Sequence, residues 1–281
     1  MLFRSVLFVP GARSDRFAKA LAAGADVVIF DLEDAVAVER KLEARRAVAD
    51  FLANRPTARS RLFVRVNATG SAWIDGDVEA AAALDAISGV VLPKVETARQ
   101  IEDVARRIPS ATVVPLLETA RGILQAASIA AADAKVPALL FGAEDLTADL
   151  GIPRTVEGEE LLFARSQLVM AAASTSAEPV DAVFTDLDDL DRLRVDAARA
   201  RALGFRGKMA IHPAQVPVIN DVFAPSAEEI ARAKSIVEAF EAAKGDAVIR
   251  LDHQMIEAPI VLRARRVLTL AREIGRRGRV E

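Results

Sequence analysis

The stretch ALLFGAEDLTADLG, residues 138–151, joins an apolar strand pattern directly to a cluster of carboxylates. Its opening residues are typical of a buried β-strand. A glycine and an alanine then lead to the adjacent acids Glu144 and Asp145, and Asp149 follows about one helical turn later. This order of strand, short loop and helix indicates a βα unit with acids at the carboxyl end of its strand.

Eight short apolar runs recur along the chain, and most of them contain four to six residues of Val, Ile, Leu and Phe. They lack strict alternation of apolar and polar residues, which is typical of parallel strands buried on both faces. Helix-like segments separate them, so the pattern predicts repeated βα units. The runs are SVLFVP (5–10), DVVIFDL (26–32), RLFVRV (61–66), GVVLPKV (89–95), TVVPLLE (112–118), ALLFGAE (138–144), VDAVFTD (180–186) and GKMAIHP (207–213).

The count of eight strands favours an α/β fold of the (β/α)₈ or TIM-barrel type over residues 1–223. A doubly wound open sheet is the alternative, but such sheets usually have fewer strands, and no G-x-G-x-x-G follows the first run. Residues 224–281 are predicted to form a C-terminal helical extension that packs on a neighbouring subunit. Ser226 and Glu229 have the spacing of a capping box, and a loop containing LDHQMIEAPI precedes the last helix.

Composition excludes several classes of function. The 281 residues carry a net charge of −3, so nothing favours nucleic acid or an anionic membrane as a partner. The chain has no cysteine and two histidines, so disulfides and thiolate metal sites are excluded, and a metal would be held mainly by oxygen ligands. No apolar run is long enough to span a bilayer, and the apolar N-terminus lacks the features of a signal peptide. We therefore expect a cytoplasmic protein.

Polar residues follow nearly every predicted strand, and in such barrels the chemistry lies at the carboxyl ends of the strands. Crowded acids raise one another's pKa unless a cation neutralises them, and two carboxylates with substrate oxygens and waters suit Mg²⁺. Glu118 and Asp145 are the favoured pair, and Arg65 can hold a substrate carboxylate through its planar fork. The strand-end candidates are Asp31, Glu33, Asp34, Arg65, Asn67, Lys94, Glu96, Glu118, Glu144, Asp145, Asp186 and His212.

Each candidate also has a structural interpretation. A single acid at a strand end often caps the next helix. Lys94 could form a Schiff base if its pKa were lowered, but an ion pair with the nearby acids is the favoured interpretation. His212 lies between Ile211 and Pro213 and is expected to be a packed, hydrogen-bonded residue, with a general-base role as the alternative.

Seven segments in series resemble the citrate lyase β-subunit-like family, the CoA-ester carbon–carbon lyases within the wider HpcH/HpaI aldolase group. The resemblance extends from residue 4 to about residue 260, and it rests on the order of the segments rather than on any single one. The segments are RSVLFVPG (4–11), DVVIFDLEDAV (26–36), FVRVN (63–67), VLPKVE (91–96), PLLETARG (115–122), FGAEDLTADLG (141–151) and GFRGKMAIHPAQV (204–216).

The resemblance implies a barrel that assembles as a homotrimer or hexamer, with Mg²⁺ (or Mn²⁺) bound by Glu118 and Asp145. It implies that Arg65 contacts the oxo acid and the developing enolate. The implied reaction is reversible cleavage of a 3-hydroxyacyl-CoA thioester of the citryl, malyl or citramalyl type into an acyl-CoA and a 2-oxo acid. Glu144 and Asp149 are expected to point away from the metal.

Further residues take roles in this scheme. The backbone amides around Gly142 and Ala143 would bind the oxo-acid carboxylate, helped by the following helix N-terminus. Arg13 and Lys19 would meet CoA phosphates. Family members that handle free CoA esters often carry an Asp in a C-terminal MID-x-P motif, which reaches a neighbouring subunit's site as an acid/base. Here QMIEAP places Glu257 at that position, with one methylene more.

Three other interpretations stay open. The chain could be an aldolase acting on free hydroxy-oxo acids without CoA. It could be a citrate lyase β-subunit that works only with an acyl-carrier partner. It could also be a barrel that binds acyl-CoA without turnover.

Overall fold

The computed structural model describes residues 2–54, 58–133, 136–243 and 247–278. The chain divides into two compact units, Met1–Phe223 and Ala224–Glu281. The first unit carries all of the barrel strands, and the second is a small helical unit with a hairpin. That the second unit packs on a neighbouring subunit stays a prediction.

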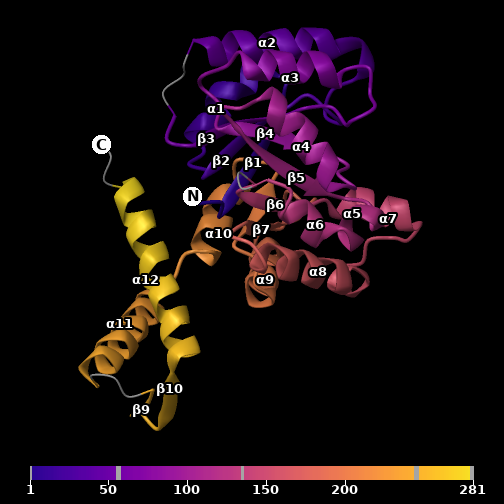
Figure 1. The fold of residues 1–281 in the computed structure, drawn as a ribbon. Coiled ribbons are helices and arrows are strands. Elements are labelled where there is room, and N and C mark those ends of the chain that lie inside the picture. Colours follow the sequence, from indigo (N-terminus) through magenta and orange to yellow (C-terminus); the bar gives the residue numbers. More distant parts are fainter. Residues whose placement is uncertain (1, 55–57, 134–135, 244–246, 279–281) are drawn as a thin grey trace. The chain divides into compact units, whose positions relative to one another are not determined.

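The first unit is a closed barrel of eight parallel strands in chain order, which confirms the predicted TIM-barrel fold. Figure 1 shows the strands at the centre of this unit, with helices around them. The strands are β1 (Ser5–Pro10), β2 (Val27–Asp31), β3 (Arg61–Arg65), β4 (Gly89–Leu92), β5 (Thr112–Leu117), β6 (Ala138–Phe141), β7 (Glu178–Asp181) and β8 (Gly207–Ala210).

The strands are apolar throughout because each packs on both of its faces. In β2, Val27 and Ile29 point into the barrel and belong to its inner core. The alternating Val28 and Phe30 belong to the outer core between strands and helices. Side chains alternate between the two faces of a strand, so a strand buried on both faces must be apolar at successive positions. This is the physical reason why the runs lacked a polar alternation.

Ten α-helices of the first unit lie among the described residues, and three short 3₁₀ turns accompany them. At the start of α4 (Ala98–Arg107), Thr97 and Gln100 form a capping box, and Ile101 and Val104 of this helix are buried. The α-helices are α1 (Phe17–Ala22), α2 (Lys41–Ala53), α3 (Ile74–Ala82), α4 (Ala98–Arg107), α5 (Ala120–Leu124), α6 (Ala126–Ala130), α7 (Ala143–Leu150), α8 (Leu162–Ala173), α9 (Leu190–Leu203) and α10 (Gln215–Val222). The 3₁₀ turns are η1 (Ser14–Arg16), η2 (Val38–Arg40) and η3 (Glu159–Leu161).

The second unit contains α11 (Ala227–Ala242), β9 (Val248–Leu251), β10 (Gln254–Glu257) and α12 (Ala258–Gly278). The capping box of Ser226 and Glu229 is confirmed at the start of α11. The predicted loop around LDHQMIEAPI is wrong, because β9 and β10 form an antiparallel hairpin there. Asp252 and His253 at its turn both have positive φ, of 46° and 64°. Two such residues in succession suit the right-handed twist of a tight hairpin, and aspartate is among the residues that tolerate this conformation.

Candidate active site

The carboxyl ends of the strands surround a pocket of about 380 Å³. Residues from several separate strand ends and from the start of α7 form its wall, as expected for a barrel of this type. The polar lining residues are Asp31, Asp34, Arg65, Glu118, Glu144 and Asp145, and the apolar ones include Phe8, Leu116, Val183 and Met209.

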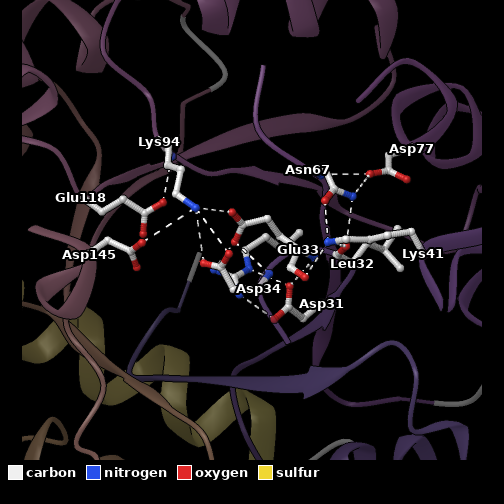
Figure 2. A network of polar contacts seen from close by, with 11 residues as sticks. Asp31, Leu32, Glu33, Asp34, Lys41, Asn67, Asp77, Lys94, Glu118 and Asp145 are labelled. Carbon is white, nitrogen blue, oxygen red and sulfur yellow. Dashed lines mark hydrogen bonds and ion pairs between the residues drawn. The ribbon is translucent and has the colours of Figure 1, made fainter. Parts of the chain in front are cut away.

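Glu118 directly follows β5 and is almost fully buried, at 1% exposure. Its Oε1 accepts a hydrogen bond of 2.8 Å from the backbone N–H of Lys94. Asp145 lies in the first turn of α7, and its side chain is 39% exposed. Figure 2 shows the two carboxylates from neighbouring strand ends on the same side of the polar network. One carboxylate is therefore fixed inside the protein, while the other faces the open pocket.

The electrostatics of this pair favour a bound cation. Burial and the nearby charge of Asp145 raise the pKa of Glu118 to about 8. A carboxylate in that position is stabilised when a cation joins the two acids. Among the described residues no group of three or more His, Cys, Asp or Glu side chains is placed to hold a metal. Two carboxylates from neighbouring strand ends fit an ion such as Mg²⁺, which takes a few carboxylates and fills its other positions with water and substrate oxygens.

Gly142, which precedes α7, packs tightly against Glu118. A Cβ at residue 142 would lie 2.5 Å from both Cβ and Oε2 of Glu118. The N–H of Gly142 donates to the carbonyl of Leu117 at 3.0 Å. Because that N–H already has a partner, the amides left to bind an oxo-acid carboxylate are those of Ala143 and the rest of the first turn of α7.

We expect Gly142→Ala to weaken Mg²⁺ binding by roughly 10- to 100-fold, because the new Cβ must displace Glu118 from its position. The backbone itself tolerates alanine, since φ at residue 142 is −94°. Calorimetric titration with Mg²⁺ measures the effect. Gly275→Ala is the control, because a Cβ at residue 275 has no neighbour within 4 Å. Unchanged Mg²⁺ affinity in Gly142→Ala would show that Glu118 does not bind the ion.

The raised pKa of Glu118 also predicts that Mg²⁺ affinity depends on pH. Below about pH 8 the carboxyl of the metal-free protein holds a proton, which Mg²⁺ must displace. Affinity should therefore fall as pH is lowered below 8, approaching about tenfold per pH unit, and level off above it. Calorimetry in two buffers of different ionisation enthalpy measures the released proton directly. Affinity that stays constant between about pH 6 and 8, with no proton release, contradicts this assignment.

Arg65, the last residue of β3, is held by two buried acids beside the pocket. Its Nε and Nη2 donate to the two oxygens of Asp31 at 2.7 and 2.6 Å. Its Nη1 lies 3.0 Å from Oε2 of Glu33. The guanidinium is thus clamped in one orientation and keeps its charge, while the residue still lines the pocket.

Lys94 has a strained backbone and an ammonium group surrounded by acids. Its φ is +53°, a conformation that non-glycine residues seldom adopt and that often marks functional sites. Its Nζ lies 2.6 Å from Glu33 and 3.8 Å from Asp145 (Figure 2). Burial lowers the pKa of Lys94, but the ion pairs outweigh burial and raise it above the usual value. A Schiff-base role needs the opposite shift, so the ion-pair interpretation is favoured.

Several strand-end residues take structural roles. Glu144 points to Arg154, with 3.2 Å between Oε1 and Nη1. Asp149 accepts a bond from the N–H of Ala120 and so caps α5. His212 accepts a bond from the N–H of Ala214 through Nδ1. Asp186 accepts two backbone bonds within its own loop, and Glu96 lies 3.8 Å from Arg121.

Three predicted site residues are not among the residues that line the pocket. Arg13 is exposed and paired with Asp15 at 2.8 Å, and Lys19 is exposed on α1. Glu257 is half-buried on β10 in the second unit. One buried contact near the site escaped the sequence altogether. Lys41, on α2, holds the backbone after β2, and no strand-end pattern points to a helical lysine.

Comparisons with known proteins show the family and the fold that this chain shares. The profile of the family described as "HpcH/HpaI aldolase/citrate lyase" matches residues 4–213. A "citrate lyase subunit beta-like protein" of Deinococcus radiodurans is 39% identical, covering 95% of this chain and 97% of that one. A "(3S)-malyl-CoA thioesterase" of Cereibacter sphaeroides is 35% identical, covering 97% and 96%. The crystal structure of the protein CitE from Mycobacterium tuberculosis with magnesium, acetoacetate and coenzyme A is 38% identical over 95% of this chain and 97% of that one, with a TM-score of 0.82.

Proposed function

This chain belongs to the HpcH/HpaI aldolase/citrate lyase family, and on that premise we propose that it is a Mg²⁺-dependent carbon–carbon lyase. Its substrate would be a 3-hydroxyacyl-CoA thioester of the citryl, malyl or citramalyl type, cleaved reversibly into an acyl-CoA and a 2-oxo acid. The observation that carries the proposal is the pair of Glu118 and Asp145 beside the clamped Arg65 at one pocket. The magnesium and coenzyme A bound to the similar CitE structure support it.

Each residue has a chemical task in this scheme. Glu118 and Asp145 would hold Mg²⁺, which supplies Lewis-acid polarisation of the oxygens of the oxo-acid half. When the carbon–carbon bond breaks, its electron pair moves into the acyl thioester, and Arg65 would stabilise the negative charge on the enolate oxygen. The carbon that bears the hydroxyl becomes the carbonyl carbon of the oxo acid as the hydroxyl oxygen gives up its proton. The enolate carbon then takes up a proton to give the acyl-CoA.

The pocket volume sets which part of the substrate lies inside. A space of about 380 Å³ accepts an oxo acid and the reacting end of a thioester. The rest of CoA must extend outside it, and we propose that Arg13 and Lys19 contact its phosphates.

We also propose Glu257 as the acid/base that moves the proton, contributed to a neighbouring subunit's site in a homotrimer or hexamer. No helix among the described residues could cross a bilayer, and we propose a cytoplasmic location.

The test is a panel of malyl-, citramalyl- and citryl-CoA assayed with Mg²⁺ or with EDTA. Mg²⁺-dependent release of a 2-oxo acid together with an acyl-CoA supports the proposal. Release of free thiol without an oxo acid would instead indicate thioester hydrolysis. Enolate exchange of pyruvate without any thioester would indicate an aldolase on free acids. Turnover only of acyl-carrier-protein thioesters would indicate a complex subunit.

A further inference from the structure

Lys41 is a buried lysine whose ammonium group is bonded to the segment that follows β2. The residue begins α2 and is 7% exposed. Its Nζ donates to the carbonyls of Leu32 and Glu33 at 2.8 and 2.7 Å. The third hydrogen goes to Oδ1 of Asn67 at 2.7 Å (Figure 2). All three donors of the ammonium are therefore used, and two of them fix backbone.

The acceptor Asn67 is itself held in place. Its Nδ2 donates to the carbonyl of Leu32 at 3.0 Å and to Oδ2 of Asp77 at 2.6 Å. The same oxygen of Asp77 accepts the backbone N–H of Asn67 at 2.9 Å. Arg45 in turn donates to Asp77 at 2.6 Å. Lys41 thus belongs to a connected network in which each polar group has a partner, and such networks fix one geometry.

The segment that Lys41 holds is also attached to the active site. Glu33, which is 4% exposed, gives its carbonyl to Lys41 and its carboxylate to Arg65 and Lys94. The backbone N–H of Leu32 donates to the carbonyl of Arg65 at 2.9 Å. Leu32 and Glu33 therefore connect the buried ammonium of Lys41 to Arg65, whose guanidinium faces the pocket.

We propose that Lys41 is a positioning residue for the lyase reaction. It fixes the carbonyls of Leu32 and Glu33, so that the Glu33 carboxylate holds Arg65 and Lys94 at the pocket. The inference rests on the proposed function, because it takes Arg65 as the group that stabilises the enolate. A displacement of about an ångström at such a group can cost roughly 10²-fold in rate. Loss of Lys41 should therefore reduce turnover although Lys41 does not touch the substrate.

Lys208 provides a matched control for the general cost of losing a buried ammonium. It is 1% exposed on β8, and its Nζ lies 2.7 Å from Asp181 and 2.6 Å from Asp196. Neither Lys208 nor its two partners lines the pocket. Lys41→Met and Lys208→Met should both lower the melting temperature, because each leaves buried acceptors without their donor.

The experiment compares kcat and KM of the Mg²⁺-loaded variants, well below both melting temperatures. Lys41→Met should lower kcat about 10- to 100-fold with KM for the thioester within about threefold, and Lys208→Met should keep kcat within about twofold. Equal losses in the two variants would overturn the proposal. If Lys41→Met does not fold, Lys41→Arg serves instead. A planar guanidinium cannot meet three acceptors arranged around an ammonium, so kcat should fall at least about fivefold, and an unchanged kcat again overturns the proposal.

A double mutant tests the route through Glu33. In a Glu33→Gln background, adding Lys41→Met should lower kcat by less than about threefold, because the link to Arg65 is already weakened. Full additivity of the two losses would overturn the route.

A crystal structure of Lys41→Met separates this proposal from the proposed function. If the Arg65–Glu33 contact opens beyond about 4 Å while the wild type cleaves no thioester, the function is wrong and the positioning role stands. If that contact persists at 3.0 Å, the positioning role is wrong.

Discussion

Glu118→Gln is expected to remove Mg²⁺-dependent cleavage and, at the same pH, to stabilise the metal-free protein. Glu118 is one of the two carboxylates proposed to hold the ion, and the amide that replaces it is a neutral, weaker ligand. We expect kcat/KM to fall by about 10³-fold or more, which corresponds to about 4 kcal/mol of transition-state stabilisation. The new side chain has nearly the same shape, and its carbonyl can still accept the N–H of Lys94.

The stabilising effect follows from the pKa of Glu118. Burial and Asp145 raise it from an ordinary value of 4.5 to about 8 in the folded protein. The folded state therefore holds a proton that the unfolded state has released, so the metal-free protein loses stability as pH rises from about 4.5 to about 8. At pH 7 this loss is about 3 kcal/mol, and glutamine, which does not ionise, removes it.

Thermal unfolding in EDTA and steady-state assays measure the two effects together. At pH 7 without metal, Glu118→Gln should unfold at a higher temperature than the wild type, and near pH 4.5 the difference should vanish. Excess Mg²⁺ should stabilise the wild type and not the variant. Glu102→Gln is the control, since Glu102 is exposed on α4 and does not line the pocket, and it should keep its activity. A variant that is inactive and also less stable at pH 7 would point to a structural role for Glu118.

The fold was predictable because a barrel strand buried on both faces leaves an apolar run, as DVVIFDL does around β2. The boundary of β7 was less clear. The strand begins at Glu178 and includes Pro179, and it ends at Asp181, before most of the predicted run of 180–186. Proline lacks the N–H that a strand donates, so local pattern argues against placing it in a sheet. The β9–β10 hairpin was missed because each strand has only four residues, and the difference in burial between its two faces is small.

The sequence predicted which residues line the site, but it did not predict how their side chains contact one another. The strand-end rule brings Glu118, Asp145 and Arg65 to one pocket from three separate segments. It does not specify that Asp31 and Glu33 clamp Arg65, because that depends on side-chain directions at the rim. It also gives no reason to connect Lys41 with Asn67, which are 26 residues apart and meet only when the start of α2 reaches the segment that follows β3. Contacts of this kind follow from tertiary packing rather than from any local period.

Arg65→Lys is expected to lower kcat by about 10²- to 10³-fold, the usual cost of losing one preorganised donor to a developing oxyanion. Lysine keeps the charge, but its ammonium cannot reproduce the fork that meets both oxygens of Asp31 and also reaches Glu33. Mg²⁺ affinity should change less than about threefold, because Glu118 and Asp145 stay in place. Steady-state kinetics and calorimetric Mg²⁺ titration measure the two quantities separately.

Arg4→Lys is a close control for this substitution. Arg4 makes the same two-pronged contact with Asp26, at 2.9 Å for both bonds, and its side chain is 11% exposed, as is that of Arg65. Arg4 immediately precedes β1, at the amino end of the barrel strands, where barrels of this type place stability rather than chemistry. Both variants should therefore lose stability, and only Arg65→Lys should lose turnover. A kcat for Arg65→Lys within about tenfold of the wild type would mean that another group carries the enolate charge.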